Sequence, residues 1–357
     1  MMYKNGWEQA KKRLTAWWDG EILDRCCAAV VVSEPVKETG KYRIGLPDDQ
    51  EGRNRYWSDA ETIIKRNRLA MEKTWFGGEA FPMISLDLGA AGHAGFFKGA
   101  RHSFEDTVWF YPSVQHLDEM EFDENTYLYQ KTLELACAFA EDSKGDYMIS
   151  MSDCSGNADV LSHLIGPDEL LPLMLEEPEV VQRAMKKAQY AYEQIHRKTY
   201  DIIKDVNQGG SCIGWLRTWA PGLHAQMQSD MSVMISSEMF RQFVEPELRA
   251  QCDFLDYSLY HFDGVEQIRH LDSLLSIEKL HAIQWTQVIC HPRCTECIAE
   301  LKRIQAAGKN LLICISPDQI RPLMENLSSK GLYLLLNADT VEEGEAMLEE
   351  ISRLTHE

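Results

Sequence analysis

The sequence lacks long hydrophobic runs and compositionally biased tracts. No stretch approaches the ~18 uninterrupted apolar residues of a membrane-spanning helix. The opening segment MMYKNGWEQAKKRL has no apolar run of the length that a secretory signal needs. We also find no repeat of fixed period and no Gly/Ser linker. These absences predict a globular protein that stays in the cytoplasm.

Positive charge is also scarce. Lys and Arg total 36 against 56 Asp and Glu, which gives a formal net charge of -20. Such a field repels nucleic-acid phosphates and anionic lipid surfaces, so we expect neither nucleic acid nor a membrane as partner. A polyanionic substrate would need a local basic pocket cut into this acidic surface. The acid excess also has a simpler explanation, because it keeps the surface soluble.

The ten cysteines are expected to be reduced thiols, most of them small core residues, because the chain shows no secretory signal. The spacing Cys290-His291-x2-Cys294-x2-Cys297 is that of structural zinc sites, but no second cysteine pair follows it. Cys294 and Cys297 share a face of the helix expected over RCTECIAELKRIQ, so an ordinary helix is favoured. Cys314 points either into a pocket or into the interior, and we favour the interior.

Short apolar runs alternate with helical patterns along the chain. Strands that are almost continuously apolar and alternate with helices predict a parallel sheet buried on both faces. The helical pattern 178–203 starts with proline at its first turn and carries an apolar face. Eight strand–helix units fit one closed (β/α)8 barrel domain over residues 1–357, although a doubly wound sheet gives similar local signals. The eight runs are 26–33, 81–88, 146–152, 209–214, 257–261, 281–286, 310–315 and 331–337.

Two long insertions follow expected strands. The polar segment 34–56 is expected to be a loop after the first strand, and segment 215–236 follows the fourth. Loops at that end of a barrel usually carry function. Trp215 and Trp219 flank Arg217 in the second insertion, and they form either aromatic walls against a substrate or a lid packed on the barrel.

Three segments carry a family resemblance: residues 13–25 with Gly20-Glu21 and Asp24-Arg25, residues 166–181 (GPDELLPLMLEEPEVV), and residues 230–246 with the order Asp, Ser, Met-Phe, Phe, Pro. They resemble the uroporphyrinogen decarboxylase superfamily, which includes corrinoid-dependent methyltransferases and the barrels of cobalamin-independent methionine synthase. The resemblance extends over most of residues 10–355. It implies a distorted (β/α)8 barrel with a deep pocket at the carboxyl ends of its strands.

The chain departs from the haem-pathway decarboxylases of that superfamily. Their Arg-Gln-Ala-Gly-Arg-Tyr motif, whose arginines hold substrate carboxylates, has no counterpart in residues 33–43, and lysine does not replace a guanidinium fork. Leu336-Asn337-Ala338-Asp339 stands where they keep Gly-His-Gly. Asp87 matches an aspartate that they use for pyrrole contact. A lyase acting on a smaller acid, with Asp87 stabilising a developing cation and no metal, therefore stays as an alternative.

The corrinoid methyltransferases resemble the chain more closely but not fully. Their His-x-Cys-Gly and Gly-Cys-Gly motifs hold zinc, and here they read His261-Phe262-Asp263-Gly264 and Asn337-Ala338-Asp339. The resemblance implies zinc or another divalent metal on His261, Asp263 and Asp339, and carboxylates in place of thiolates favour a harder ion. His261 and Asp263 also lie two apart at a strand end, which suits metal ligands, an acid–base pair, or an inward histidine beside a turn.

The leading hypothesis is a methyl or other one-carbon transferase acting on a small molecule, with a corrinoid on a partner protein as the second participant. A barrel that binds a small molecule or a corrinoid protein without catalysis is a third hypothesis, and a homodimer is the default assembly. Asp230 lies either at the pocket or at a helix cap. The candidate catalytic residues are His261, Asp263, Asp87 and Asp230, and the candidate substrate-binding residues are Asp153, Trp215, Trp219 and Asn337.

Overall fold

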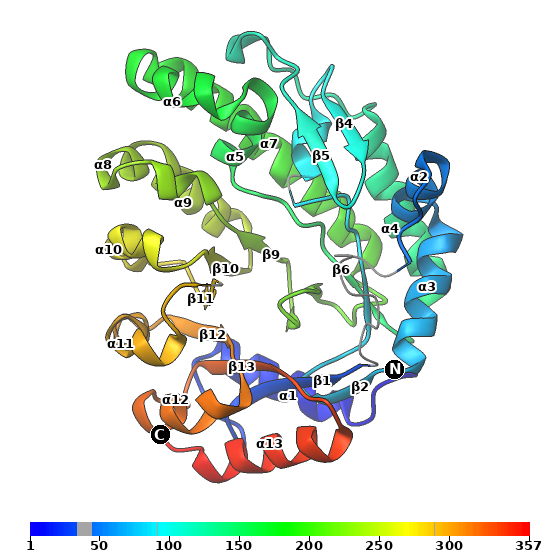
Figure 1. Ribbon diagram of the computed structural model, residues 1–357, viewed down its shortest axis with the longest axis vertical. Coiled ribbons are helices and arrows are strands. Elements are labelled where there is room, and N and C mark those ends of the chain that lie inside the picture. Colours follow the sequence, from blue (N-terminus) through cyan, green and yellow to red (C-terminus); the bar gives the residue numbers. More distant parts are fainter. Residues whose placement is uncertain (34–44, 91, 289) are drawn as a thin grey trace.

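The computed structural model describes residues 1–33, 45–90, 92–288 and 290–357. Each of the eight apolar runs contains a strand, so the predicted strands are confirmed. Their order along the chain is also the expected one, with helices between them (Figure 1). They are β1 (Cys27–Val32), β3 (Met83–Ser85), β6 (Met148–Ser150), β7 (Ser211–Ile213), β10 (Tyr257–Phe262), β11 (Ala282–Trp285), β12 (Asn310–Cys314) and β13 (Leu332–Asn337).

The strands form two main sheets. The larger sheet has the strand order β2-β1-β13-β12-β11-β10-β9. Its strands from β1 through β13 to β9 (His224–Met227) are parallel, and β2 (Trp75–Gly78) is antiparallel at its edge. The smaller sheet runs β3-β6-β7-β8, in which β8 (Thr218–Ala220) is antiparallel to β7. Strands such as β11 and β13 are buried almost throughout, which is typical of parallel strands covered on both faces.

The closed eight-stranded barrel expected from the sequence is not formed as a continuous ladder in the described ranges. The chain turns back after β7 into β8, so β9 and not β7 pairs with β10, and β2 occupies the edge of β1. The two sheets still meet at Ser211, whose hydroxyl accepts a hydrogen bond from the backbone N–H of His224 at 2.6 Å. That hydroxyl also donates to the carbonyl of Gly222 at 2.9 Å.

Helices surround the strands (Figure 1). The predicted helix over 178–203 is confirmed as α7, and its predicted apolar face, including Tyr192 and Ile195, is buried. The helices are α1 (Trp7–Trp18), α2 (Gln50–Ser58), α3 (Ala60–Glu72), α4 (Tyr127–Ser143), α5 (Asn157–Ile165), α6 (Pro167–Glu176), α7 (Pro178–Ile203), α8 (Ser237–Met239), α9 (Glu245–Phe254), α10 (Leu271–Leu275), α11 (Ile298–Ala306), α12 (Ile320–Asn326) and α13 (Val341–Leu354). Short helical turns include η1 (Gly92–Phe96), η3 (Asp230–Met234), the π-helical η4 (Phe240–Val244) and η6 (Cys294–Glu296).

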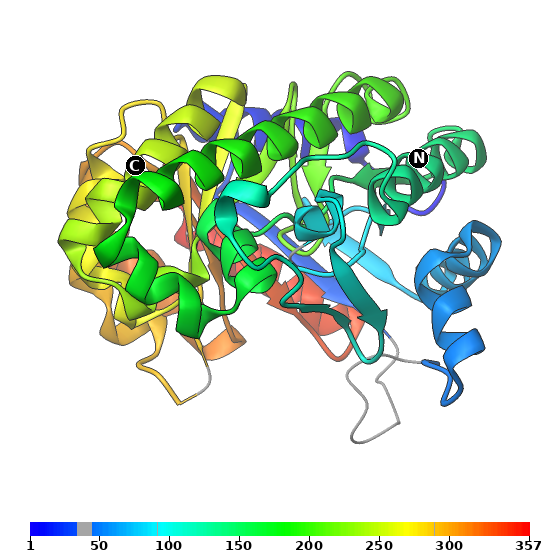
Figure 2. The ribbon, with the colours of Figure 1, turned by 90° about the horizontal axis from the view of Figure 1, so that it is seen from above.

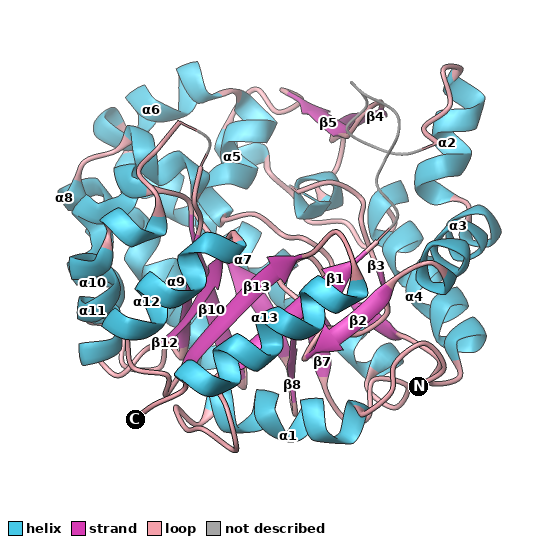
Figure 3. Cartoon of the chain, turned by 60° about the horizontal axis from the view of Figure 1, so that its bottom comes forward, coloured by secondary structure: helices cyan, strands magenta, loops and turns pink. Residues whose placement is uncertain are grey.

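Helix α1 covers the end at which the parallel strands begin (Figure 3). Its Trp7, Trp17 and Trp18 are buried in a core cluster with residues of β1, β8 and β13. Arg13 of the same helix lies 3.2 Å from Glu79, a fully buried carboxylate that Arg25 also contacts at 2.8 Å. This end is therefore closed by packing and ion pairs, and the opposite end is left for a site.

The described part of segment 34–56 is not loop throughout. Helix α2 begins at Gln50, because the Asp49 side chain accepts the N–H of Gly52 at 2.8 Å and caps it. Residues 34–44 of that predicted loop lie outside the described residues. A separate two-stranded ribbon, β4 (Arg101–Phe104) and β5 (Val108–Tyr111), lies away from the main sheets in Figure 3 and is drawn in teal in Figure 2.

All ten cysteines are unpaired, and seven of them are buried, as expected. Cys294 begins η6 and Cys297 precedes α11, so the single helix expected over that segment is a short 3-10 turn followed by an α-helix. No helix in the described ranges is both long and apolar enough to span a bilayer.

Candidate functional site

The carboxyl ends of the parallel strands meet around an open pocket of about 320 Å³. Parallel strands direct their carboxyl ends to one edge, where α/β proteins place their ligands. Strands β10 to β13 each contribute side chains, and the turn after β7 supplies Trp215 and Arg217. The lining residues are Trp215, Arg217, His261, Gln284, Thr286, Gln287, Cys314, Ile315, Ser316, Leu335 and Asn337.

His261 is held in one orientation at the end of β10. Its Nδ1 is hydrogen-bonded to the amide oxygen of Gln284 on the neighbouring strand, and the Thr286 hydroxyl lies 3.3 Å away. The Trp215 ring packs edge-on against the imidazole at 5.1 Å between centroids. The amide oxygen of Gln284 at Nδ1 favours the tautomer in which Nδ1–H donates and Nε2 offers its lone pair. That lone pair is the donor that a metal or an acidic proton needs.

Three potential metal ligands converge beside this imidazole. Nε2 of His261 lies 3.9 Å from a carboxylate oxygen of Asp263. Together with Asp230 they form, in the described part of the chain, one group whose ligand atoms all lie within 4.8 Å of one another. Asp230 was predicted as a catalytic residue or a cap, and Ser229 rather than Asp230 occupies the cap position of η3. The structure therefore places its carboxylate with the predicted His261–Asp263 pair.

Gly264 makes the turn that brings Asp263 back toward His261. Its φ of 85° lies in the left-handed region, which favours glycine. A Cβ at this position would lie 3.0 Å from a methyl group of Val288. The His-x-x-Gly spacing noted in the sequence is thus a backbone requirement of the site.

Among the described residues Asp339 does not belong to this group, so its place among the metal ligands stays a prediction. Strand β13 ends at Asn337, and the next residue, Ala338, donates its N–H to Val31 of β1. The Asp339 backbone N–H then donates to Glu343 at 2.9 Å, in the turn that starts α13. Asn337 itself lines the pocket, where its side-chain oxygen accepts a hydrogen bond from Arg217 at 2.7 Å.

A chain of amides connects Asp153 with the metal-ligand group. The Gln226 amide donates to Asp153 and also to Gln228 at 2.7 Å, and Gln228 lies 3.3 Å from Asp230. The indole N–H of Trp215 donates to the amide oxygen of Gln226 at 2.6 Å. Loss of water around Asp153, together with the nearby charges of Asp87 and Asp230, raises the pKa of Asp153 to about 8. Asp153 is therefore a neutral acid at pH 7.

The pKa of Asp230 is also raised, first by loss of water and then by the charge of Asp263, while His261 opposes the change. Asp230 is nevertheless an exposed residue at the rim of the site. The raised pKa therefore reflects a partial loss of water around a carboxyl group that still reaches solvent, with a smaller contribution from the charge of Asp263.

Asp87 lies beside a second, mostly polar cavity of about 260 Å³ that Tyr56, Arg66 and Ser85 also line. Its carboxylate accepts the N–H of Gly89 at 3.2 Å. Asp87 does not line the His261 pocket, but its charge helps to raise the pKa of Asp153.

Two predictions about side-chain placement are wrong. Trp219 lies fully buried near α1, where its indole packs edge-on against Trp7 and donates to the carbonyl of Asn207 at 3.0 Å. It is separated from Trp215 because β8 runs back toward the beginning of β7. Cys314, expected in the interior, is exposed and lines the pocket, because it ends β12 at the carboxyl edge.

Asp159 was not predicted as a site residue, although its hydrogen bonds hold the backbone around Asp230 in place. Its fully buried carboxylate accepts backbone N–H groups of Gly156, Asp230 and Met231, at 2.9, 3.1 and 2.7 Å. Burial raises its pKa, and the Asp230 charge raises it further. The sequence signal was the aspartate three residues after Gly156 at the start of α5, which is the capping-box position.

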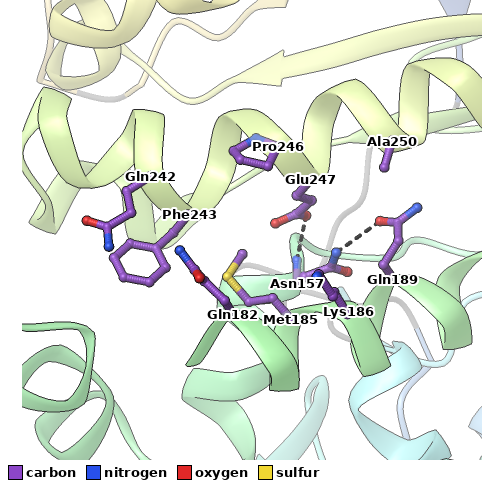
Figure 4. Close-up of a pocket in the computed structure, with 10 residues that line it drawn as sticks. All are labelled: Asn157, Gln182, Met185, Lys186, Gln189, Gln242, Phe243, Pro246, Glu247 and Ala250. Carbon is purple, nitrogen blue, oxygen red and sulfur yellow. Dashed lines mark hydrogen bonds between the residues drawn. The ribbon is translucent and has the colours of Figure 1, made fainter. Parts of the chain in front are cut away.

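Another cavity, of about 350 Å³, lies between α7 and the η4–α9 segment (Figure 4). Buried Glu247 points from α9 toward Asn157 and accepts its backbone N–H at 2.7 Å. The Asn157 amide donates in turn to Gln189 of α7 at 3.0 Å. Glu247 thus caps the first turn of α5, and its carboxylate has a structural role.

No protein-family profile matches the chain, and no curated protein sequence matches it. A methyltransferase from Methanosarcina mazei has a similar structure, with a TM-score of 0.60 over 96% of this chain and 98% of that chain. The two sequences are 15% identical, so the likeness shows a shared fold.

Proposed function

We propose that this protein is a metal-assisted enzyme that transfers a methyl or other one-carbon group from a small molecule. The observation that carries the proposal is the convergence of Asp230, His261 and Asp263 beside the pocket at the strand ends. Two further points support it: the sequence resemblance to corrinoid methyltransferases, and the fold shared with a methyltransferase. We also interpret the two sheets, which meet at Ser211, as a distorted (β/α)8 barrel.

The donor set fits a divalent ion harder than a thiolate-bound zinc, because it offers one imidazole and two carboxylates. Metal–ligand bonds of ~2.0–2.2 Å require ligand atoms within roughly 4.4 Å of one another, so small side-chain rotations close the observed group. An ion bound there would supply Lewis-acid polarisation of a substrate heteroatom. Thiol activation by a thiolate-zinc site is not part of the proposal.

The surrounding residues have separate tasks in this proposal. Gln284 fixes the His261 ring so that Nε2 faces the ligand group. Asp153, neutral at pH 7, is joined to the ligand group through the Gln226 and Gln228 amides, and we assign to it the proton that the heteroatom takes up after losing its methyl group. The methyl carbon leaves with a bond to the acceptor, and the donor heteroatom keeps the electron pair. A corrinoid on a partner protein is the acceptor that the resemblance implies, and a homodimer stays the expected assembly.

A turnover assay tests this proposal. Metal-free protein would be incubated with O-, N- and S-methyl donors and a corrinoid acceptor, with and without added Zn²⁺, Mn²⁺ or Co²⁺. We expect demethylation that depends on metal and that His261→Ala abolishes. Equal turnover in the presence of a chelator would contradict a metal-assisted transfer.

A second candidate, a decarboxylase or related lyase acting on a small acid, is favoured by the closeness of Asp87 to the neutral acid Asp153. In that case Asp87 would stabilise a developing cation while Asp153 returned the proton. Asp87→Asn would abolish this turnover, and chelators would leave it intact.

A further inference from the structure

Arg217 lies at the mouth of the pocket, where hydrogen bonds hold both its backbone and its side chain. Its φ of 51° lies in the left-handed region, which is uncommon for a residue with a side chain and marks a conformation held by its surroundings. Tyr333 donates its hydroxyl to the Arg217 carbonyl at 2.7 Å. The two terminal nitrogens of the guanidinium donate to Leu336 and Asn337, each at 2.7 Å. The guanidinium is therefore placed before any ligand arrives.

This arginine has no counter-ion in the described part of the chain. No described carboxylate lies within 4 Å of it, and the titratable groups that influence it are Tyr333 and Cys314. That is unusual in a protein with 56 acidic and 36 basic residues. Arg217 is half-buried, and partial burial of a cation without a counter-ion is unfavourable, because the charge loses hydration and gains no partner. A ligand that brings a negative charge would remove that penalty.

The guanidinium also keeps donors free for a ligand. Of its five N–H groups, two serve the hydrogen bonds to Leu336 and Asn337, and the others have no described partner. A planar fork with free donors matches the two oxygens of a carboxylate better than it matches a neutral group. Arg217 lines the same pocket as His261 and Cys314.

We propose that Arg217 binds a carboxylate of the substrate, so that this protein acts on a small organic acid. The proposal rests on the proposed function in one respect, namely that the reacting group of the substrate faces His261. The binding of the substrate carboxylate rests on Arg217 alone. A pocket of about 320 Å³ is at the small end of ligand sites. With one arginine in its lining and the carboxylates of Asp230 and Asp263 beside His261, the site repels a polyanion and admits a monoanion.

Cys314 provides a test that needs neither the substrate nor turnover. It is one of three exposed cysteines, so a Cys137→Ser/Cys290→Ser protein keeps it as the exposed thiol. Its alkylation rate would be measured with iodoacetate, which is an anion, and with neutral iodoacetamide. The ratio of the two rates isolates the charge of the reagent, because both react with the same thiolate. We expect Arg217→Gln to lower that ratio on the order of tenfold.

Three controls make the test decisive. Arg241→Gln removes an exposed arginine of η4 and should leave the ratio unchanged. Arg217→Lys keeps the charge without the planar fork and should give an intermediate ratio. In the protein with Arg217 intact, benzoate should slow the alkylation by iodoacetamide and its neutral analogue benzamide should not. That comparison stands even if Arg217→Gln folds poorly.

Equal protection by benzoate and benzamide, or an unchanged rate ratio in a folded Arg217→Gln protein, would overturn the proposal. Either result would leave the metal site untouched. Conversely, a protein that selects anions at Arg217 but binds no metal would keep this inference and remove the proposed reaction.

Discussion

Asp153→Asn should change how the stability of the protein depends on pH. The pKa of Asp153 is raised to about 8 from an ordinary value of 3.8, by loss of water and by the charges of Asp87 and Asp230. Its carboxyl group is therefore neutral at pH 7 in the folded protein and ionised in the unfolded chain. Asparagine has the same shape, keeps the oxygen that accepts from Gln226, and stays neutral at every pH.

The sign follows from the direction in which folding moves the pKa. An acid whose pKa is raised on folding stabilises the protein below its unfolded pKa, and the stabilisation is lost as the pH rises through about 8. Each tenfold change in proton affinity corresponds to about 1.4 kcal/mol, so the full difference between the two pKa values sets an upper limit of about 6 kcal/mol. Asp153 is only half-buried, and solvent screening lowers this figure. We expect about 2 kcal/mol of loss between pH 5 and pH 9.

Urea unfolding followed by tryptophan fluorescence measures this loss. The free energy of unfolding of the unaltered protein should fall, relative to that of Asp153→Asn, by about 2 kcal/mol from pH 5 to pH 9. Asp205→Asn removes a charge from an exposed aspartate and serves as the control for net charge. A difference between the unaltered protein and Asp153→Asn that stays constant over this range would refute a neutral Asp153 at pH 7.

Two other pairs of variants separate the site from the scaffold. Trp219→Ala should cost about 3–5 kcal/mol of stability, because it opens a cavity in the core, and should leave metal affinity unchanged. Trp215→Ala, whose side chain is 45% exposed, should cost less than about 1 kcal/mol but weaken metal binding, because it frees His261 and Gln226. Asp159→Ala should cost about 2 kcal/mol and also weaken metal binding, since three backbone N–H groups around Asp230 lose their acceptor. The matched cap deletion Thr340→Ala should cost about 1 kcal/mol and leave the metal unchanged, with stability measured in urea and affinity by calorimetry.

Local patterns predicted the elements well because they depend on short-range physics. The apolar face of 178–203 and the eight apolar runs each became the expected helix or strand. His261 and Asp263 were singled out because they stand where the corrinoid methyltransferases keep a His-x-Cys-Gly motif, and the two side chains do lie 3.9 Å apart.

Pairing and long-range partners were not readable in the same way. Strands β8 and β9 have three and four residues, which is too short for a periodic signal. Because of them β9, and not β7, pairs with β10. Trp219 was misplaced for this reason. Asp159 and Gln284 act on residues far away in the sequence, so no spacing pattern connects them with Asp230 or His261.

Metal content measured by plasma mass spectrometry tests the central claim most directly. Protein purified without chelators or an affinity metal would be compared with His261→Ala/Asp263→Ala and with Asp339→Ala. We predict near-stoichiometric divalent metal in the unaltered protein and in Asp339→Ala, and its loss in the double variant. Absence of metal from the unaltered protein, even after dialysis against Zn²⁺, Mn²⁺ and Co²⁺, would contradict the metal-assisted transferase.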